Sequence, residues 1–149
     1  NSLIFSWCTW PKLELGLKCM KSWGFDYVTT PFVWNKTTAK GDPHHGIGFW
    51  TPGSTEFVML GRRGKGIPRR KDTRSQTKQL ANTWTEHVIE APVGRHSAKP
   101  PEVRDKIIEL VGDHPRIELF ARERTEGWDA TGLDLDGVDI RDFLQQGQQ

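Results

Sequence analysis

The sequence predicts an α/β protein whose sheet is mixed, mostly parallel and flanked by helices. Short apolar runs rich in Val, Ile, Phe and Tyr alternate with two stretches of helical spacing, residues 11–22 and 100–112. Each helical stretch lies between two apolar runs, which is the order of a strand–helix–strand unit. A length of 149 residues, with 35% hydrophobic and 27% charged residues, fits one globular domain over residues 1–149.

The first unit occupies the N-terminal part of the chain. Residues 2–7 are apolar and aromatic, which predicts a buried strand. Pro11 suits a first helical turn, and apolar residues then recur at helical spacing up to Gly24. Residues 25–34 are rich in Tyr, Val, Thr and Phe, which predicts a strand with an edge or bulge at Pro31. This order predicts two neighbouring parallel strands joined by a right-handed crossover.

The alternation resumes after a glycine-rich loop at residues 38–48. Pro100 and Pro101 suit the first turn of a helix that ends at Gly112. The strand after this helix completes a second strand–helix–strand unit, and apolar residues among acids predict a short C-terminal helix around residues 138–143. The further strands are predicted at residues 56–60, 87–91 and 116–121.

Positive charge is concentrated in one segment. The net charge is +2, but residues 62–78 hold eight Lys/Arg and one acid, which is +7 for the segment and leaves −5 for the rest. Residues 62–83 also lack apolar periodicity, which predicts a long basic loop within the domain. The asymmetry indicates an anionic partner such as nucleic acid; the alternative is a solvated basic loop.

Several classes of protein are disfavoured. No apolar run approaches the roughly 20 residues of a membrane span, and no signal peptide is visible. Cys8 and Cys19 lack the spacing of a metal or redox motif, so we expect a reduced, cytoplasmic setting. Asp42, His44 and His45 are conceivable metal ligands, but no second cluster supports them and we expect no metal. His96 is either catalytic or a hydrogen-bonding loop residue.

Seven tryptophans are many for this length. We expect Trp7, Trp10 and Trp23 to fill the core. Trp34 and Trp50 flank the glycine-rich loop instead, where they either stack on unpaired or flipped bases or pack in the core.

The best ligand-site candidate is the stretch from Arg116 to Gly132. Its strand carries Glu118 and Phe120 and is followed by Arg122 and Arg124. In open α/β sheets, ligands bind beyond the carboxyl ends of the strands.

Short segments throughout the chain resemble, in order, one protein family. Each segment is weak alone, but their ordered combination over about residues 2–140 is specific. The family is that of the eukaryotic mRNA N6-adenosine methyltransferase catalytic subunit and its bacterial and phage DNA adenine methyltransferase relatives; the short linkers look more like the bacterial and phage members. The segments are Val33-Trp-Asn-Lys-Thr37, Gly46-Ile-Gly-Phe-Trp-Thr51, Glu56-Phe-Val-Met-Leu-Gly61 with Arg63-Gly-Lys65, Val88-Ile-Glu-Ala-Pro92, His96-Ser-Ala-Lys-Pro100, Glu118-Leu-Phe-Ala-Arg122 and Gly127-Trp-Asp129.

This resemblance implies a Rossmann-like fold that binds S-adenosylmethionine and transfers its methyl group to the N6 amino group of adenine in nucleic acid, DNA rather than RNA. It implies that Lys99, Glu118, Leu119, Phe120 and Arg122 contact the cofactor. It leaves open a homodimer or heterodimer. The residues expected to bind DNA or RNA are Trp34, Lys36, Trp50, Arg62, Arg63, Lys65, Arg69 and Arg70.

The chain departs from the family in two places. The family carries an Asp-Pro-Pro-Trp motif upstream of the first strand, and this tetrapeptide does not occur in the 149 residues. A Gly-Asn pair of the family is Gly132-Leu133 here. We therefore expect an N-terminal part to be missing, no catalytic residue within this chain, and little or no activity from it alone. The alternatives are a non-catalytic methyltransferase-like subunit that binds nucleic acid and a basic nucleic-acid protein on a reused fold.

Overall fold

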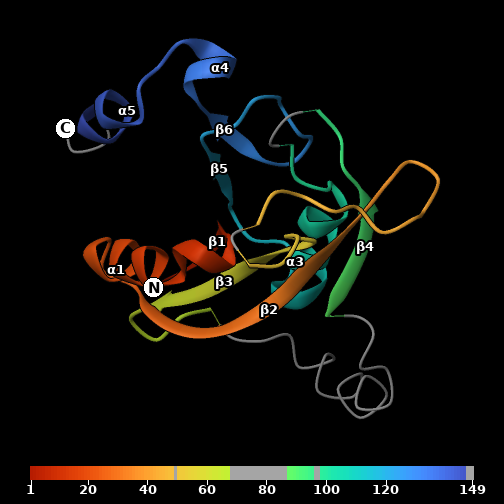
Figure 1. Cartoon of the computed structure of the whole chain (residues 1–149). Coiled ribbons are helices and arrows are strands. Elements are labelled where there is room, and N and C mark those ends of the chain that lie inside the picture. Colours follow the sequence, from red (N-terminus) through yellow and green to blue (C-terminus); the bar gives the residue numbers. More distant parts are fainter. Residues whose placement is uncertain (49, 68–86, 96–97, 147–149) are drawn as a thin grey trace. The chain divides into compact units, whose positions relative to one another are not determined.

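The computed structural model describes residues 1–48, 50–67, 87–95 and 98–146. The chain divides into two compact units, Asn1–Gly112 and Asp113–Gln149, and each contains its own sheet (Figure 1). Among the described residues, no helix has the length and apolar character needed to cross a membrane.

The first unit is built on a four-stranded mixed sheet. Its strands lie in the order β1-β3-β2-β4. β3 is antiparallel to both β1 and β2, whereas β2 and β4 are parallel. The predicted mixed sheet is confirmed, but the prediction that it is mostly parallel is wrong for this unit. The strands are β1 (Ser2–Cys8), β2 (Asp26–Thr37), β3 (Thr55–Arg63) and β4 (Val88–Pro92).

β3 lies between the two strands that the sequence predicts as neighbours. β1 and β2 point in the same direction because both are antiparallel to β3, but they share no hydrogen bonds. Residues Glu56 to Met59 of β3 are all buried, as expected for a central strand with both faces covered. β3 therefore lies inside the sheet because its side chains are apolar enough to be buried on both faces.

Two helices cover the two faces of this sheet. A 3₁₀ turn at Trp10–Lys12 leads into α1 (Leu13–Ser22), and α3 spans Glu102–Val111. Val58 shares a core cluster with Val103 of α3, whereas Phe57 and Met59 share the other with Met20 of α1. Because successive strand residues face opposite sides of a sheet, α1 and α3 lie on opposite faces.

Local sequence signals locate several element ends correctly. Gly24 and Gly112 follow the two helices with φ of 78° and 90°, a backbone region that favours glycine. The pairing of β2 with β3 shifts register between Thr29 and Phe32, which confirms the irregularity predicted at Pro31. β3 continues to Arg63, so the first two basic residues lie in a strand; residues 68–83 of the predicted basic loop lie outside the described part of the chain.

The tryptophans are distributed differently from the prediction. Trp7 packs against the core, but Trp10 is 53% exposed and Trp23 is 49% exposed, so their assignment to the core is wrong. Trp10 lies with its ring centroid 4.3 Å from that of Phe57 and donates a hydrogen bond to Thr55 Oγ1. An indole that is half exposed can pack on the core and still satisfy its N–H at the surface.

The second unit contains a two-stranded parallel sheet. β5 (Ile117–Leu119) pairs with β6 (Asp129–Thr131), and two short helices follow, α4 (Leu133–Asp136) and α5 (Ile140–Gln146). The predicted strand at residues 116–121 is present but shorter. Within this unit, β5 pairs with β6 in a sheet of two strands.

Candidate functional site

A buried carboxylate held by two lysines stands at one end of the four-stranded sheet. Glu56, at the start of β3, is 9% exposed. Lys36 on β2 donates a hydrogen bond to its Oε1 over 2.9 Å, and Lys99, which precedes α3, donates to its Oε2. The three side chains carry one negative and two positive charges, so this cluster has a net charge of +1.

The strand register brings these three residues together. Trp34 pairs with Glu56, and Lys36 follows two residues later on the same face of β2. β4 is parallel to β2, with Thr37 opposite Pro92, so both strands end at the same edge. Lys99 belongs to the connection that leaves β4 at this edge. The cluster therefore lies beyond the carboxyl ends of two parallel strands, where α/β proteins bind ligands.

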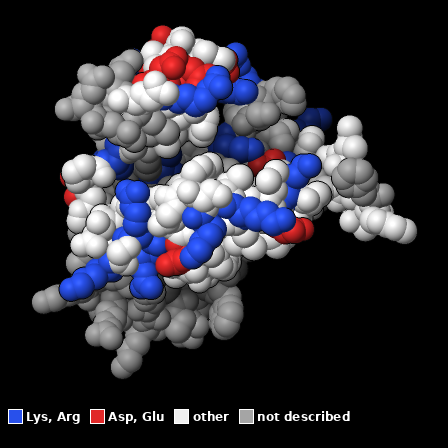
Figure 2. Space-filling view, turned by 90° about the vertical axis from the view of Figure 1, so that its left-hand side faces the viewer, with Lys and Arg blue, Asp and Glu red and all other residues white. Residues whose placement is uncertain are grey.

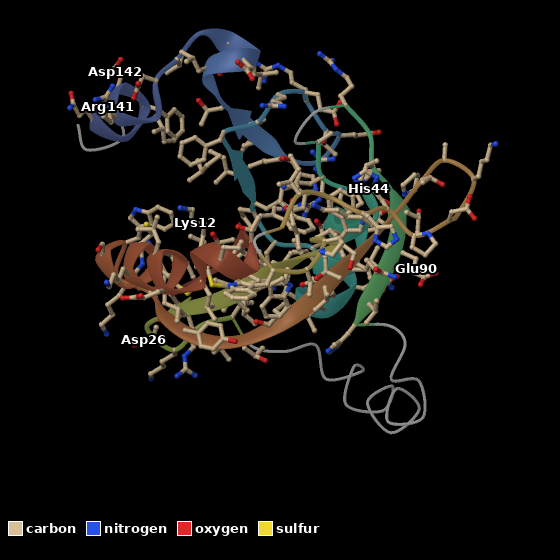
Figure 3. The ribbon with its side chains drawn as sticks, viewed as in Figure 1. Lys12, Asp26, His44, Glu90, Arg141 and Asp142 are labelled. Carbon is tan, nitrogen blue, oxygen red and sulfur yellow. The ribbon has the colours of Figure 1, made fainter. Side chains whose placement is uncertain are left out.

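The cluster opens into a cavity of about 270 Å³. His44 and Arg95 add basic side chains to its wall, and the Lys36 Nζ lies 5.3 Å from the centroid of the Trp34 ring. Figure 3 shows His44 beside the ends of β2 and β4, while Asp26 lies at the opposite end of β2. A second cavity of about 380 Å³ reaches Glu56 and Lys99 past Trp7, Cys8 and Trp23. A cationic cavity with one fixed carboxylate suits a polar, anionic ligand.

The pKa of Glu56 records this environment. Burial raises the pKa of its carboxyl, but the hydrogen bonds and charges of Lys99 and Lys36 outweigh burial, and the pKa lies below its ordinary value. Glu56 is therefore ionised at neutral pH. Burial also raises the pKa of the neighbouring Cys8 thiol, which keeps that group protonated.

We predict a pH dependence of stability that originates from Glu56. Because its folded pKa lies below the unfolded value of about 4.3, its contribution is complete above that pH and is lost as pH falls through the folded pKa. Urea unfolding of wild type and Glu56→Gln at pH 6 and pH 3 measures this contribution. Wild type should lose more stability on acidification than the variant; equal losses would contradict the lowered pKa.

The residues predicted to bind nucleic acid do not form one continuous site in the described part of the chain. Lys36 lies in the cavity, and Trp50 is 99% exposed. Trp34 is 3% exposed within β2 and donates its indole N–H to the Ala91 carbonyl, so the expectation that it stands outside a strand interior is wrong. Its burial follows from pairing on both sides of β2. Arg69 and Arg70, like His96, lie outside the described residues.

Arg62, Arg63 and Lys65 are exposed at the far end of β3 from Glu56. Arg62 lies six positions after Glu56 along the strand, which is about 20 Å at the rise of a β-strand. Arg63 also stacks over Phe25, at 4.9 Å from the ring centroid. Lys21 pairs with Asp26 near this end, and Figure 2 shows blue and red side chains side by side on this side of the molecule.

In the second unit, four predicted cofactor residues surround the carboxyl end of β5. Glu118 is half-buried, and Leu119 is partly exposed. Phe120 has a φ of 60°, unusual for a residue other than glycine, and its ring is largely exposed. Arg122 forms an ion pair with Asp134 over 3.2 Å. Strained backbone of this kind is concentrated at ligand sites, where it aims a side chain.

Glu56 is the residue whose role sequence reasoning missed. Its one signal is an acidic side chain at the start of an otherwise apolar, central strand, since buried Glu is rare unless it is paired. The pairing partners lie 20 and 43 residues away in sequence, so the ion pairs themselves leave no local pattern. Within the described residues, no group of three or more His, Cys, Asp or Glu could hold a metal ion.

Comparison with known proteins gives a consistent result. The family model MT-A70 matches residues 1–134. The chain is 35% identical over 135 residues to the Type II methyltransferase M.MunI of Mycoplasma sp, which covers 91% of this chain and 51% of that protein.

Eukaryotic proteins are also similar. The probable N(6)-adenosine-methyltransferase MT-A70-like of Oryza sativa subsp. japonica is 30% identical, over 95% of the chain and 19% of that protein. The N(6)-adenosine-methyltransferase catalytic subunit METTL3 of Homo sapiens is 28% identical, over 95% and 23%. The chain thus spans about half the length of the bacterial relative and about a fifth of these two eukaryotic relatives.

Proposed function

The chain belongs to the MT-A70 family, and we propose on this basis that its protein transfers a methyl group from S-adenosylmethionine to the N6 amino group of adenine in nucleic acid, on a Rossmann-like fold. The proposed preference for DNA rests on the short linkers and on the higher identity to the bacterial Type II methyltransferase than to the human N(6)-adenosine-methyltransferase. The single observation that carries a site for this chemistry is the ionised Glu56 in the cavity with Lys36 and Lys99.

Glu56 supplies a fixed hydrogen-bond acceptor for an exocyclic amine. Each of its oxygens accepts one hydrogen bond from a lysine and retains acceptor capacity. An amino group that donates to this carboxylate is held in place while the new C–N bond forms. The lowered pKa of Glu56 makes its carboxylate a weak base. The methylated nitrogen therefore loses its proton to solvent or to a base other than Glu56.

The excess positive charge of the cavity suits the anionic parts of the substrates. We assign Lys36, with Arg95 and His44 beside it, to a phosphate of the target nucleotide. Arg62, Arg63 and Lys65 lie about 20 Å away along β3 and suit phosphates remote from the target.

S-adenosylmethionine supplies a methyl group on a sulfonium sulfur when bound. The residues that fit it are those that the family resemblance indicates. In the first unit, Lys99 has the charge to pair with its carboxylate. In the second unit, Glu118 has the chemistry to accept from ribose hydroxyls, and the exposed ring of Phe120 suits the adenine. The family resemblance alone assigns these residues to one cofactor. Leu119 and Arg122 complete the proposed contacts.

Calorimetric titration of S-adenosylmethionine into the chain tests the cofactor assignment. Lys99→Met should weaken binding about 10- to 100-fold, because one charge-assisted hydrogen bond is lost. Lys106→Met is the matched control: its side chain is 30% exposed against 32% for Lys99, and it pairs with Glu109 on the surface of α3. No heat with wild type at millimolar cofactor, or equal affinities of the two variants, would contradict the assignment.

A further inference from the structure

Two large apolar side chains stand in solvent at the tip of a hairpin. Gly46 and Gly53 exchange backbone hydrogen bonds of 3.0 and 3.1 Å, and the segment between them presents Ile47 and Trp50, both fully exposed. We call Ile47, Gly48, Trp50 and Thr51 the hairpin tip. Among the described residues, these two large side chains therefore contribute no buried apolar area to the stability of this unit.

The turn of this hairpin is so tight that only glycine fits at positions 46 and 48. A Cβ on Gly48 would lie 1.8 Å from the carbonyl oxygen of Thr51, and one on Gly46 would lie 2.7 Å from that of Gly53. Any side chain at these positions would force the turn open. The backbone is therefore built to close this turn, in which Trp50 is fully exposed.

The base of the hairpin is attached to the rim of the Glu56 cavity. Lys36 N–H donates to the Ser54 carbonyl, and His44 N–H donates to the Lys36 carbonyl, while both side chains line the cavity. Figure 3 shows His44 beside the ends of β2 and β4. The charged residues from position 36 to 54 are Lys36, Lys40 and Asp42, which give this segment a net charge of +1.

We propose that Trp50, supported by Ile47, is a wedge that enters the base stack of a DNA duplex beside the target adenine and occupies the space that the base leaves. This inference rests on the proposed function. The N6 amino group of a paired adenine is hydrogen-bonded inside the duplex and must leave the stack to reach a cavity. Apolar side chains inserted between base steps unstack them, and the positive rim attracts the flanking phosphates.

Duplexes that contain 2-aminopurine at several adenine positions test the wedge, because this base fluoresces when it is unstacked. Wild type should bind the duplex and raise the fluorescence. Trp50→Ala should bind about 10-fold more weakly, as expected for the loss of one aromatic–base stacking contact, and should give no rise. Tyr27→Ala, which removes an exposed aromatic side chain near the other end of β2, is the matched control and should behave as wild type.

A duplex with an abasic site opposite the adenine distinguishes insertion of Trp50 into the base stack from binding of Trp50 to the DNA surface. Because unpairing is already accomplished there, the deficit of Trp50→Ala should shrink to about twofold. A fluorescence rise that survives Trp50→Ala, or wild-type binding without any rise, would overturn the wedge and leave the proposed function intact.

Two further results would also decide against the wedge. Sedimentation of the free chain as a dimer that Trp50→Ala dissociates would make the hairpin tip a contact between copies. Failure of wild type to bind any duplex or single strand would overturn the nucleic-acid assignment itself.

Discussion

Replacement of Trp34 by alanine should lower the free energy of unfolding by about 4 kcal/mol, the range found for large aromatic side chains removed from a core. Trp34 is 3% exposed and packs with Phe32, Val58 and Val103. Its indole N–H is bonded to the Ala91 carbonyl over 2.8 Å, and this acceptor would lose its partner in the variant. Urea unfolding followed by circular dichroism measures the loss.

Trp50→Ala is the matched control for this prediction. It removes the same side chain from a fully exposed position, and its effect on stability should stay within about 0.5 kcal/mol. Trp34→Phe should fall between the two, because it retains most of the buried area and loses the hydrogen bond. Equal stabilities of Trp34→Ala and Trp50→Ala would show that Trp34 is not part of the core.

Glu56→Gln should lower the free energy of unfolding by about 3 kcal/mol, because it leaves two partly buried ammonium groups without their counter-charge. The neutral amide retains the shape of the side chain, so the loss reports charge and not packing. Urea unfolding at pH 7 measures it. Glu90→Gln, which removes an exposed carboxylate on β4 that pairs with Asn35, should change stability by less than about 0.5 kcal/mol.

A double variant shows whether the loss has this origin. Adding Lys99→Met to Glu56→Gln removes one of the two uncompensated charges, so the combined loss should be smaller than the sum of the single losses. Additive losses would mean that Lys99 and Glu56 do not interact in the folded protein.

Local chemistry made many elements predictable. The apolar spacing before Gly24 and Gly112 located both helices of the first unit within about two residues, because those glycines follow helices whose buried faces are encoded at i, i+3 and i+4. The apolar runs likewise marked β1 to β4. The ordered segments that resemble the methyltransferase family also indicated the family correctly.

Neighbour relations were not predictable in the same way. The placement of β3 between β1 and β2 depends on hydrogen bonds between strands distant in sequence, and the apolar run of β3 does not encode its partners. The strand predicted from the sequence ends at Trp34, which placed this residue beside the loop. In the structure β2 continues three residues further, to Thr37, which pairs with Pro92 of β4. Trp10 shows the reverse, since an aromatic residue type alone does not distinguish core from surface.

Residue order was thus sufficient for the family, the α/β class and most element positions, because helix and strand periods and glycine stops are local properties of the chain. The strand order, the burial of Trp34 and the joining of Lys36, Glu56 and Lys99 required the tertiary structure. Each of these depends on register between distant segments, and a buried ion pair exists only where that register brings opposite charges within hydrogen-bond distance.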